Sequence, residues 1–106
     1  MTYHLIDLLT ELAASGKCYH EFIREVSMSV GLYQLDAGSM DPQKPHAEDE
    51  VYYVISGKAH IKVKDAVHTV QPGSILFVQA GDEHLIYDIE ENLTALVFFA
   101  PPETVA

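Results

Sequence analysis

Histidine and acidic residues gather in the stretch KPHAEDEVYYVISG, residues 44–57. His46 is followed by Glu48, Asp49 and Glu50, and imidazole and carboxylate groups are side chains that bind divalent metals. His46 and Glu50 stand four residues apart, which in a straight strand would separate them by roughly 13 Å, too far to share one ion. A shared ion therefore requires a bend between them. The stretch is interpreted either as half of a metal site or as a solvated acidic loop before a strand.

The composition favours one acidic domain. The chain has 106 residues, and its 48% hydrophobic content is enough for one core. Six basic residues stand against sixteen acidic ones, which disfavours nucleic acid and anionic membrane as partners because both attract lysine and arginine clusters. There is no apolar run of about 18 residues and no basic start of a signal peptide. Because Cys18 stands alone, no internal disulfide is expected, and the prediction is a cytoplasmic protein.

The chain divides into a helical start and a β-rich remainder. Residues 4–14 carry a leucine stripe at helical spacing, followed by a Ser-Gly stop; the stripe is Leu5, Leu8, Leu9 and Leu12. We therefore expect a helical segment over residues 1–17 that packs on a barrel formed by residues 18–106, the two making one domain.

Short β-like runs follow the helix at nearly regular spacing. They cover residues 19–24, 28–35, 50–55, 58–64, 74–79, 84–89 and 93–99, with turn residues such as Ser56-Gly57 between them. This pattern predicts an antiparallel sandwich or barrel. Because strand side chains alternate between faces, Tyr52 should share a face with Glu50.

One part of the chain resembles the first signature of the cupin superfamily, which is Gly, five residues, His-x-His, three or four residues, Glu, six residues, Gly. Gly38 begins the matching stretch, His46 takes the second histidine position, Glu50 follows after three residues and Gly57 after six more. Lys44 stands where the first histidine belongs.

A second stretch resembles the second cupin signature, which is Gly, five residues, Pro-x-Gly, two residues, His, three residues, Asn. Gly73, Gly81 and His84 match, whereas Gln79 replaces the proline and Asp88 the asparagine. The two signatures occur in order and in register, and the 15 residues between them resemble the spacing in small single-domain cupins.

The resemblance implies an all-β fold, an antiparallel double-stranded β-helix or jelly-roll barrel with a short N-terminal helix. In such a barrel His46, Glu50 and His84 would converge as two imidazoles and a carboxylate. This set suits one divalent transition metal, namely iron, zinc, nickel or manganese. Lys44 cannot bind a metal while it is protonated, and it either holds an anionic ligand group or points to solvent. Tyr52 would line the ligand pocket or belong to the core.

The resemblance also implies function. We expect a small metal-binding cupin with a small organic ligand in the barrel, acting as a dioxygenase or isomerase. The alternative is a non-catalytic binding or sensor module without an essential metal. Glu48 and Asp49 are expected in a solvated bend. Because an antiparallel sandwich leaves edge strands exposed, we expect a homodimer in which residues 19–24 and 28–35 pair across a two-fold axis and the helix helps to cover the join.

Overall fold

Seven strands follow one N-terminal helix in the computed structural model, which describes residues 1–43 and 45–104. The helix is α1 (Leu5–Ser15), and the strands are β1 (Tyr19–Arg24), β2 (Ser29–Leu35), β3 (Asp41–Gln43), β4 (Asp49–Val63), β5 (Ala66–Val70), β6 (Ile75–Val78) and β7 (His84–Ala100). The all-β architecture with a short N-terminal helix is confirmed. None of the helices in the described ranges is long and apolar enough to cross a bilayer.

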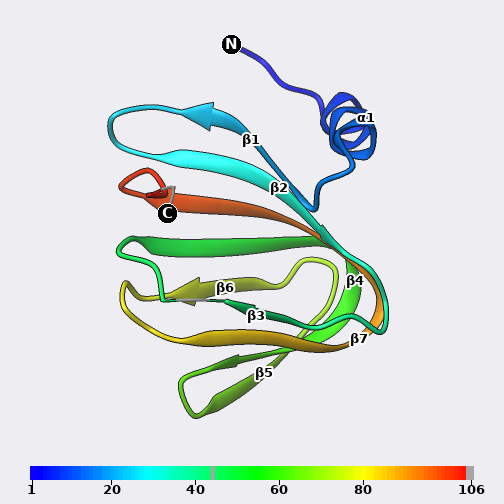
Figure 1. Ribbon diagram of the computed structural model, residues 1–106, viewed down its shortest axis with the longest axis vertical. Coiled ribbons are helices and arrows are strands. Elements are labelled where there is room, and N and C mark those ends of the chain that lie inside the picture. Colours follow the sequence, from blue (N-terminus) through cyan, green and yellow to red (C-terminus); the bar gives the residue numbers. More distant parts are fainter. Residues whose placement is uncertain (44, 105–106) are drawn as a thin grey trace.

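The two long strands, β4 and β7, pair with each other and are shared by two layers. In one layer their partners are β2 and β6, because β2 pairs with residues 93–99 of β7 and β6 with residues 50–53 of β4. In the other layer they are β3 and β5, which pair with residues 84–86 of β7 and 59–63 of β4. Every pairing is antiparallel, and Figure 1 shows β4 and β7 bending from one layer into the other.

The predicted turn at Ser56-Gly57 is wrong, because β4 runs through it. The residues predicted as two strands, 50–55 and 58–64, form one strand that bends where its register with β7 shifts. Gly57 has φ +98°, a conformation that side chains with a Cβ disfavour. Likewise 84–89 and 93–99 form the single strand β7. At each bend the strand passes from one layer into the other. Turn-forming residues occur both at such bends and at chain reversals, so local sequence does not distinguish the two.

The core fills the space between the two layers. Alternate residues of β4 face inward, so that Tyr52, Val54 and Ile61 are buried together with residues of β7 such as Ile86 and Val97. The inward alternation predicted for this segment is therefore observed.

The leucine stripe of α1 packs on the outer side of the first layer. Leu8 and Leu12 are buried against Leu32 of β2, whereas Leu5 is 38% exposed. The helix ends at Gly16 in the left-handed conformation, as the Ser-Gly stop predicted. The division into a segment at 1–17 and a barrel at 18–106 stays a prediction.

Gly57→Ala should destabilise the fold more than Gly73→Ala. Both glycines have positive φ, +98° and +91°, so both variants have the same conformational penalty. A Cβ at Gly57 would also collide with the carbonyl oxygen of Asn92 and lie 2.7 Å from the Cα of Leu93, whereas no atom lies within 4 Å at Gly73 in the described structure. Such overpacking costs about 1–3 kcal/mol. Urea unfolding measures how much free energy of unfolding each variant loses. Equal losses would show that β7 moves away from the added Cβ at this bend.

Candidate metal centre

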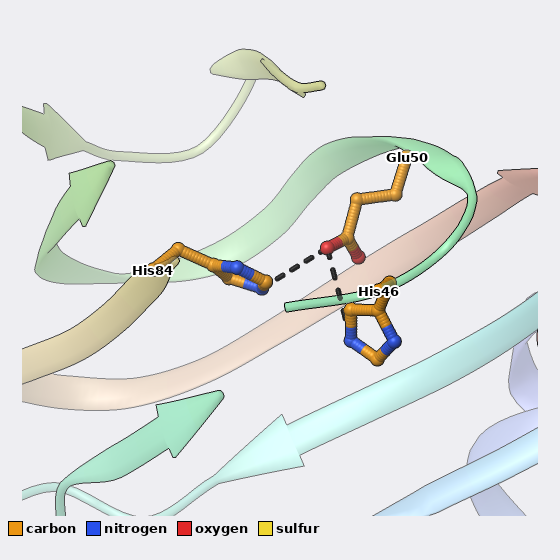
Figure 2. Close-up of side chains that lie close together, drawn as sticks. All are labelled: His46, Glu50 and His84. Atoms are coloured by element: carbon orange, nitrogen blue, oxygen red, sulfur yellow. Dashed lines mark ion pairs between the residues drawn. The ribbon is translucent and has the colours of Figure 1, made fainter. Parts of the chain in front are cut away.

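His46, Glu50 and His84 meet inside the barrel (Figure 2). One potential ligand atom from each residue lies within 4.8 Å of the others. Glu50 Oε1 is 3.0 Å from His84 Nε2 and 3.9 Å from His46 Nε2. The three residues that the sequence grouped are therefore neighbours in space.

Three separate segments supply these side chains. Glu50 lies near the start of β4 and faces inward, His84 is the first residue of β7, and His46 lies in the loop before β4. Ala47 and Glu48 form a bend between the histidine and the strand, as a shared ion requires. The amide of Gly81 donates to the carbonyl oxygen of His46 at 2.8 Å, which links the loop before β7 to the loop before β4.

The Glu50 carboxylate is buried without a hydrogen bond of good geometry. Its residue is 1% exposed, and neither oxygen has a hydrogen-bond partner in the part of the chain that the structure describes. His84 Nε2 is close to Oε1, but closeness alone does not satisfy an ionised oxygen. His46 Nε2 is also buried without a partner among the described residues. Burying a carboxylate in this way is costly unless a cation compensates it, so these donors fit a divalent metal ion.

Both imidazole rings have their other nitrogen directed away from the centre. His84 Nδ1 lies 3.3 Å from the carbonyl oxygen of Asp82, an acceptor that selects the Nδ1–H tautomer and leaves a lone pair on Nε2. His46 Nδ1 faces Glu103 Oε2 at 3.7 Å. Metal-binding histidines are oriented in this way by a carbonyl or carboxylate behind the ring.

Tyr52 lies beside His84, on the same face of β4 as Glu50. Its hydroxyl is 3.2 Å from His84 Nε2, and the residue is 2% exposed. Burial first, and then the nearby Glu50 carboxylate, raises the pKa of Tyr52 well above its ordinary value. Without a bound metal the hydroxyl therefore stays protonated and can donate a hydrogen bond within the site.

The expectation that Glu48 lies in a solvated bend is wrong. Glu48 is 3% exposed, and its carboxylate accepts hydrogen bonds from the amide and the hydroxyl of Thr104. The C-terminal segment folds back over the bend, a contact between residues 56 positions apart that local sequence does not reveal. Asp49 is exposed as expected and accepts from the amide of Ala80. Lys44 lies outside the described residues.

Glu103 is a site residue that the sequence reasoning missed. The amide of Glu103 donates to the buried hydroxyl of Ser29, and its carboxylate faces His46. Burial raises the pKa of Glu103, the charge of His46 opposes this rise, and the Glu50 carboxylate adds to it. No periodicity or motif in the last residues marks this position.

A cavity of about 260 Å³ is lined by neighbours of these three residues, although none of the three lines it. Its wall includes Tyr52, which contacts His84, and Phe99, whose ring centroid is 5.1 Å from that of His46. Glu103, which faces His46, also lines it. One layer of side chains, including Tyr52 and Glu103, therefore lies between this cavity and the candidate metal centre.

Comparison with known proteins supports the fold. The sequence model of a family described as "Cupin domain" matches residues 31–99. An uncharacterized protein of Streptomyces coelicolor is 50% identical over 102 residues, which is 96% of this chain and 97% of that protein. The crystal structure of the DMSP lyase DddQ from Ruegeria pomeroyi superposes with a TM-score of 0.73 at 21% identity, over 77% of this chain and 45% of that one. KdgF from Halomonas sp. gives a TM-score of 0.70 at 15% identity, over 78% of this chain and 76% of that one.

Tyr19 and Tyr52 should not ionise while the protein is folded. Burial raises the pKa of both phenols, with added negative charge from Glu50 and Glu103. A raised folded-state pKa favours the neutral phenol, so this stabilisation is present below the ordinary value of about 10 and is lost as pH rises through the folded value. In an alkaline titration of metal-depleted protein followed by tyrosinate absorbance, Tyr52→Phe should overlay the wild type until circular dichroism reports unfolding.

The same titration in concentrated urea is the control, because there Tyr52→Phe must lose the signal of one of the six tyrosines. If Tyr52→Phe gives less tyrosinate absorbance than the wild type while both proteins are folded, the Tyr52 hydroxyl ionises in the folded protein. Its assignment as a hydrogen-bond donor would then be wrong.

Proposed function

The chain belongs to the cupin family, and from that membership we propose that it is a small metal-binding cupin that holds a small organic ligand in its barrel. The observation that carries the proposal is the Glu50 carboxylate, which is buried without a well-formed hydrogen bond to any described residue while two Nε2 atoms lie near it. A buried carboxylate beside two imidazole nitrogens is a ligand set that a divalent cation complements.

We assign the ligands as His46 and His84 through Nε2 and Glu50 through its carboxylate. Two imidazoles and a carboxylate are a set that iron, zinc, nickel and manganese accept, with further coordination positions left to water or ligand. A bound ion would supply Lewis acidity toward an oxygen of the ligand. The protein's part is to orient the two rings through Asp82 and Glu103 and to present the Tyr52 hydroxyl.

The proposal includes two roles for this site. In the first the protein is an enzyme of the dioxygenase or isomerase class that uses the bound metal, with the Tyr52 hydroxyl near His84 as a candidate acid-base group. In the second it is a binding or sensor module without an essential metal. Elemental analysis of protein purified without added metal, together with ligand binding before and after chelation, distinguishes them: substoichiometric metal and unchanged binding favour the module.

We further propose a homodimer formed through a bare part of the first layer. Three side chains on its outer face are strongly exposed, Tyr53 at 41%, Ile75 at 72% and Phe77 at 57%. Tyr53 and Ile75 are cross-strand partners on β4 and β6. The outer face continues under α1, where Ile55 packs against the buried helix leucines. A second copy would cover what the helix leaves open. This surface differs from the one expected from sequence, where β1 and β2 would pair across the two-fold axis. We prefer it because it exposes more apolar side chains than β1 and β2 do.

Removing any one of His46, Glu50 and His84 should abolish most metal affinity. With two protein ligands left, water would have to hold much of the coordination shell, so His84→Ala and Glu50→Gln should each weaken Zn²⁺ binding by about 100-fold or more, beyond the loss expected for an outer-shell partner. Calorimetric titration with Zn²⁺, Ni²⁺ and anaerobic Fe²⁺ measures this. Binding should also weaken as pH falls, because a protonated imidazole cannot ligate.

Two matched controls separate this site from general charge effects. Asp49→Asn removes an exposed carboxylate adjacent to Glu50, and His68→Ala removes an exposed histidine on β5. Both should bind Zn²⁺ like the wild type. If His84→Ala binds as tightly as the wild type, or if Asp49→Asn loses the ion and Glu50→Gln does not, the ligand assignment fails.

Phe77→Glu should convert the dimer to a monomer. The side chain is 57% exposed, so a glutamate can remain in water in the folded monomer, but it would place a charge inside the proposed contact. Light scattering should give about twice the chain mass of 11.8 kDa for the wild type and the chain mass for the variant. Val67→Glu, at a 55% exposed position on β5, is the matched control and should stay dimeric. A monomeric wild type at micromolar concentration would overturn the proposal.

A further inference from the structure

The chain continues past β7 into a short segment that lies over the bend carrying His46. We call residues 101–104 the C-terminal strap. β7 ends at Ala100, which is paired with Asp49 at the start of β4, so the chain leaves the sheet directly beside the bend. Figure 1 shows the chain turning back on itself just after β7. The pairing of the two long strands therefore brings the strap to the bend.

Two buried side chains hold the strap in place. The amide of Glu103 donates to the hydroxyl of Ser29 at 2.9 Å, and Ser29 on β2 is buried. The amide and the hydroxyl of Thr104 donate to the two carboxylate oxygens of Glu48, at 3.2 and 2.5 Å. Glu48 is also buried, and a carboxylate in such a position is costly without donors. The strap thus links the bend to the end of β2.

The loop before β7 holds the same bend from another side. The amide of Gly81 donates to the carbonyl oxygen of His46, and the amide of Ala80 donates to the carboxylate of Asp49, both at 2.8 Å. These contacts lie on either side of Glu48 in the chain, and Thr104 contacts Glu48 itself. Two segments that are distant in sequence therefore fix the bend together.

The conformation of the bend determines where His46 lies relative to the other assigned ligands. Glu50 and His84 belong to β4 and β7, whereas His46 lies in a loop, and loops move more than paired strands. Ligand geometry has to be held to within about 0.5 Å, so a loosened bend would lower metal affinity without removing a ligand. The affinity of the centre should therefore depend on the contacts that hold this loop.

We propose that the C-terminal strap holds His46 in position for metal binding, with Thr104 as a positioning residue that acts through Glu48. The inference rests on the proposed metal site and deepens it by naming the contact that controls its affinity. Thr104 is not among the assigned ligands. Its two donors satisfy the buried carboxylate of Glu48, and this keeps the bend between His46 and Glu50 closed.

Thr104→Val tests this role, because it removes the hydroxyl donor and nearly keeps the shape of the side chain. It should weaken Zn²⁺ binding by about tenfold, the lower end of the loss expected for a group that orients a ligand from behind. Thr104→Ser keeps the hydroxyl and should bind Zn²⁺ like the wild type. Neither substitution changes the charge of the protein, so electrostatic attraction of the ion is the same in all three proteins. Calorimetric titration measures the affinities.

A second measurement follows the bend in metal-depleted protein. Because the Gly81 amide donates to the carbonyl oxygen of His46, its hydrogen exchange rate reports how often the two loops separate. Thr104→Val should speed this exchange by at least about threefold, and Thr104→Ser should not. Thr69→Val makes the same substitution at an exposed threonine on β5 and should leave both Zn²⁺ affinity and Gly81 exchange unchanged. NMR measures the exchange.

Ser29→Ala is an independent test of the strap. It removes the acceptor of the Glu103 amide at a position on β2, away from the bend. It should weaken Zn²⁺ binding and speed Gly81 exchange in the same direction as Thr104→Val. Circular dichroism and urea unfolding of each variant show that the protein remains folded under the conditions of the titrations.

Unchanged Gly81 exchange in Thr104→Val would overturn the proposal, because the strap would then not hold the bend. Faster exchange with Zn²⁺ affinity equal to that of the wild type would overturn it as well, since the metal centre would not depend on the bend. So would equal effects of Thr104→Val and Thr104→Ser, which would exclude the hydroxyl as the important contact. If the wild type does not take up Zn²⁺, the metal-binding proposal fails by itself, and Gly81 exchange in metal-depleted protein still decides whether the strap positions His46.

Discussion

The burial of the Glu50 carboxylate inside an apolar barrel is the constraint on which the site depends. The residue is 1% exposed and lies among core positions of β4, where hydrophobic side chains alternate inward. Keeping an ionised group there requires compensation, and the surrounding structure is arranged accordingly. The loop before β4 brings His46 to one side, the start of β7 brings His84 to the other, and the Tyr52 hydroxyl approaches from the same strand.

This convergence is possible because β4 is bent. His84 is paired with Val63, thirteen positions along β4 from Glu50, and a straight strand of that length would span roughly 40 Å. His84 Nε2 nevertheless lies 3.0 Å from Glu50. The two halves of β4 belong to opposite layers, and the bend near Gly57, where the chain passes close to β7, brings the layers face to face. Stability of the bend and geometry of the site are therefore coupled.

The C-terminal segment completes the site from outside the barrel strands. Thr104 binds the buried Glu48 at the bend, and Glu103 faces His46 and lines the ligand cavity. The segment thus connects the conformation of the loop that carries His46 with the wall that a ligand would contact.

The sequence by itself determined the local features and, through its resemblance to cupins, the family fold. Period-two alternation placed Glu50 and Tyr52 on one inward face, the Ser-Gly stop ended the helix, and the spacing of two signatures grouped His46, Glu50 and His84. Metal binding by these three residues stays a prediction. Only the tertiary structure decided that Ser56-Gly57 continues a strand, that Glu48 is buried and that Glu103 joins the site. Alternation and capping depend on neighbours within a few residues, whereas these outcomes depend on contacts between segments tens of residues apart, which form only when the two layers close and the chain end folds over them.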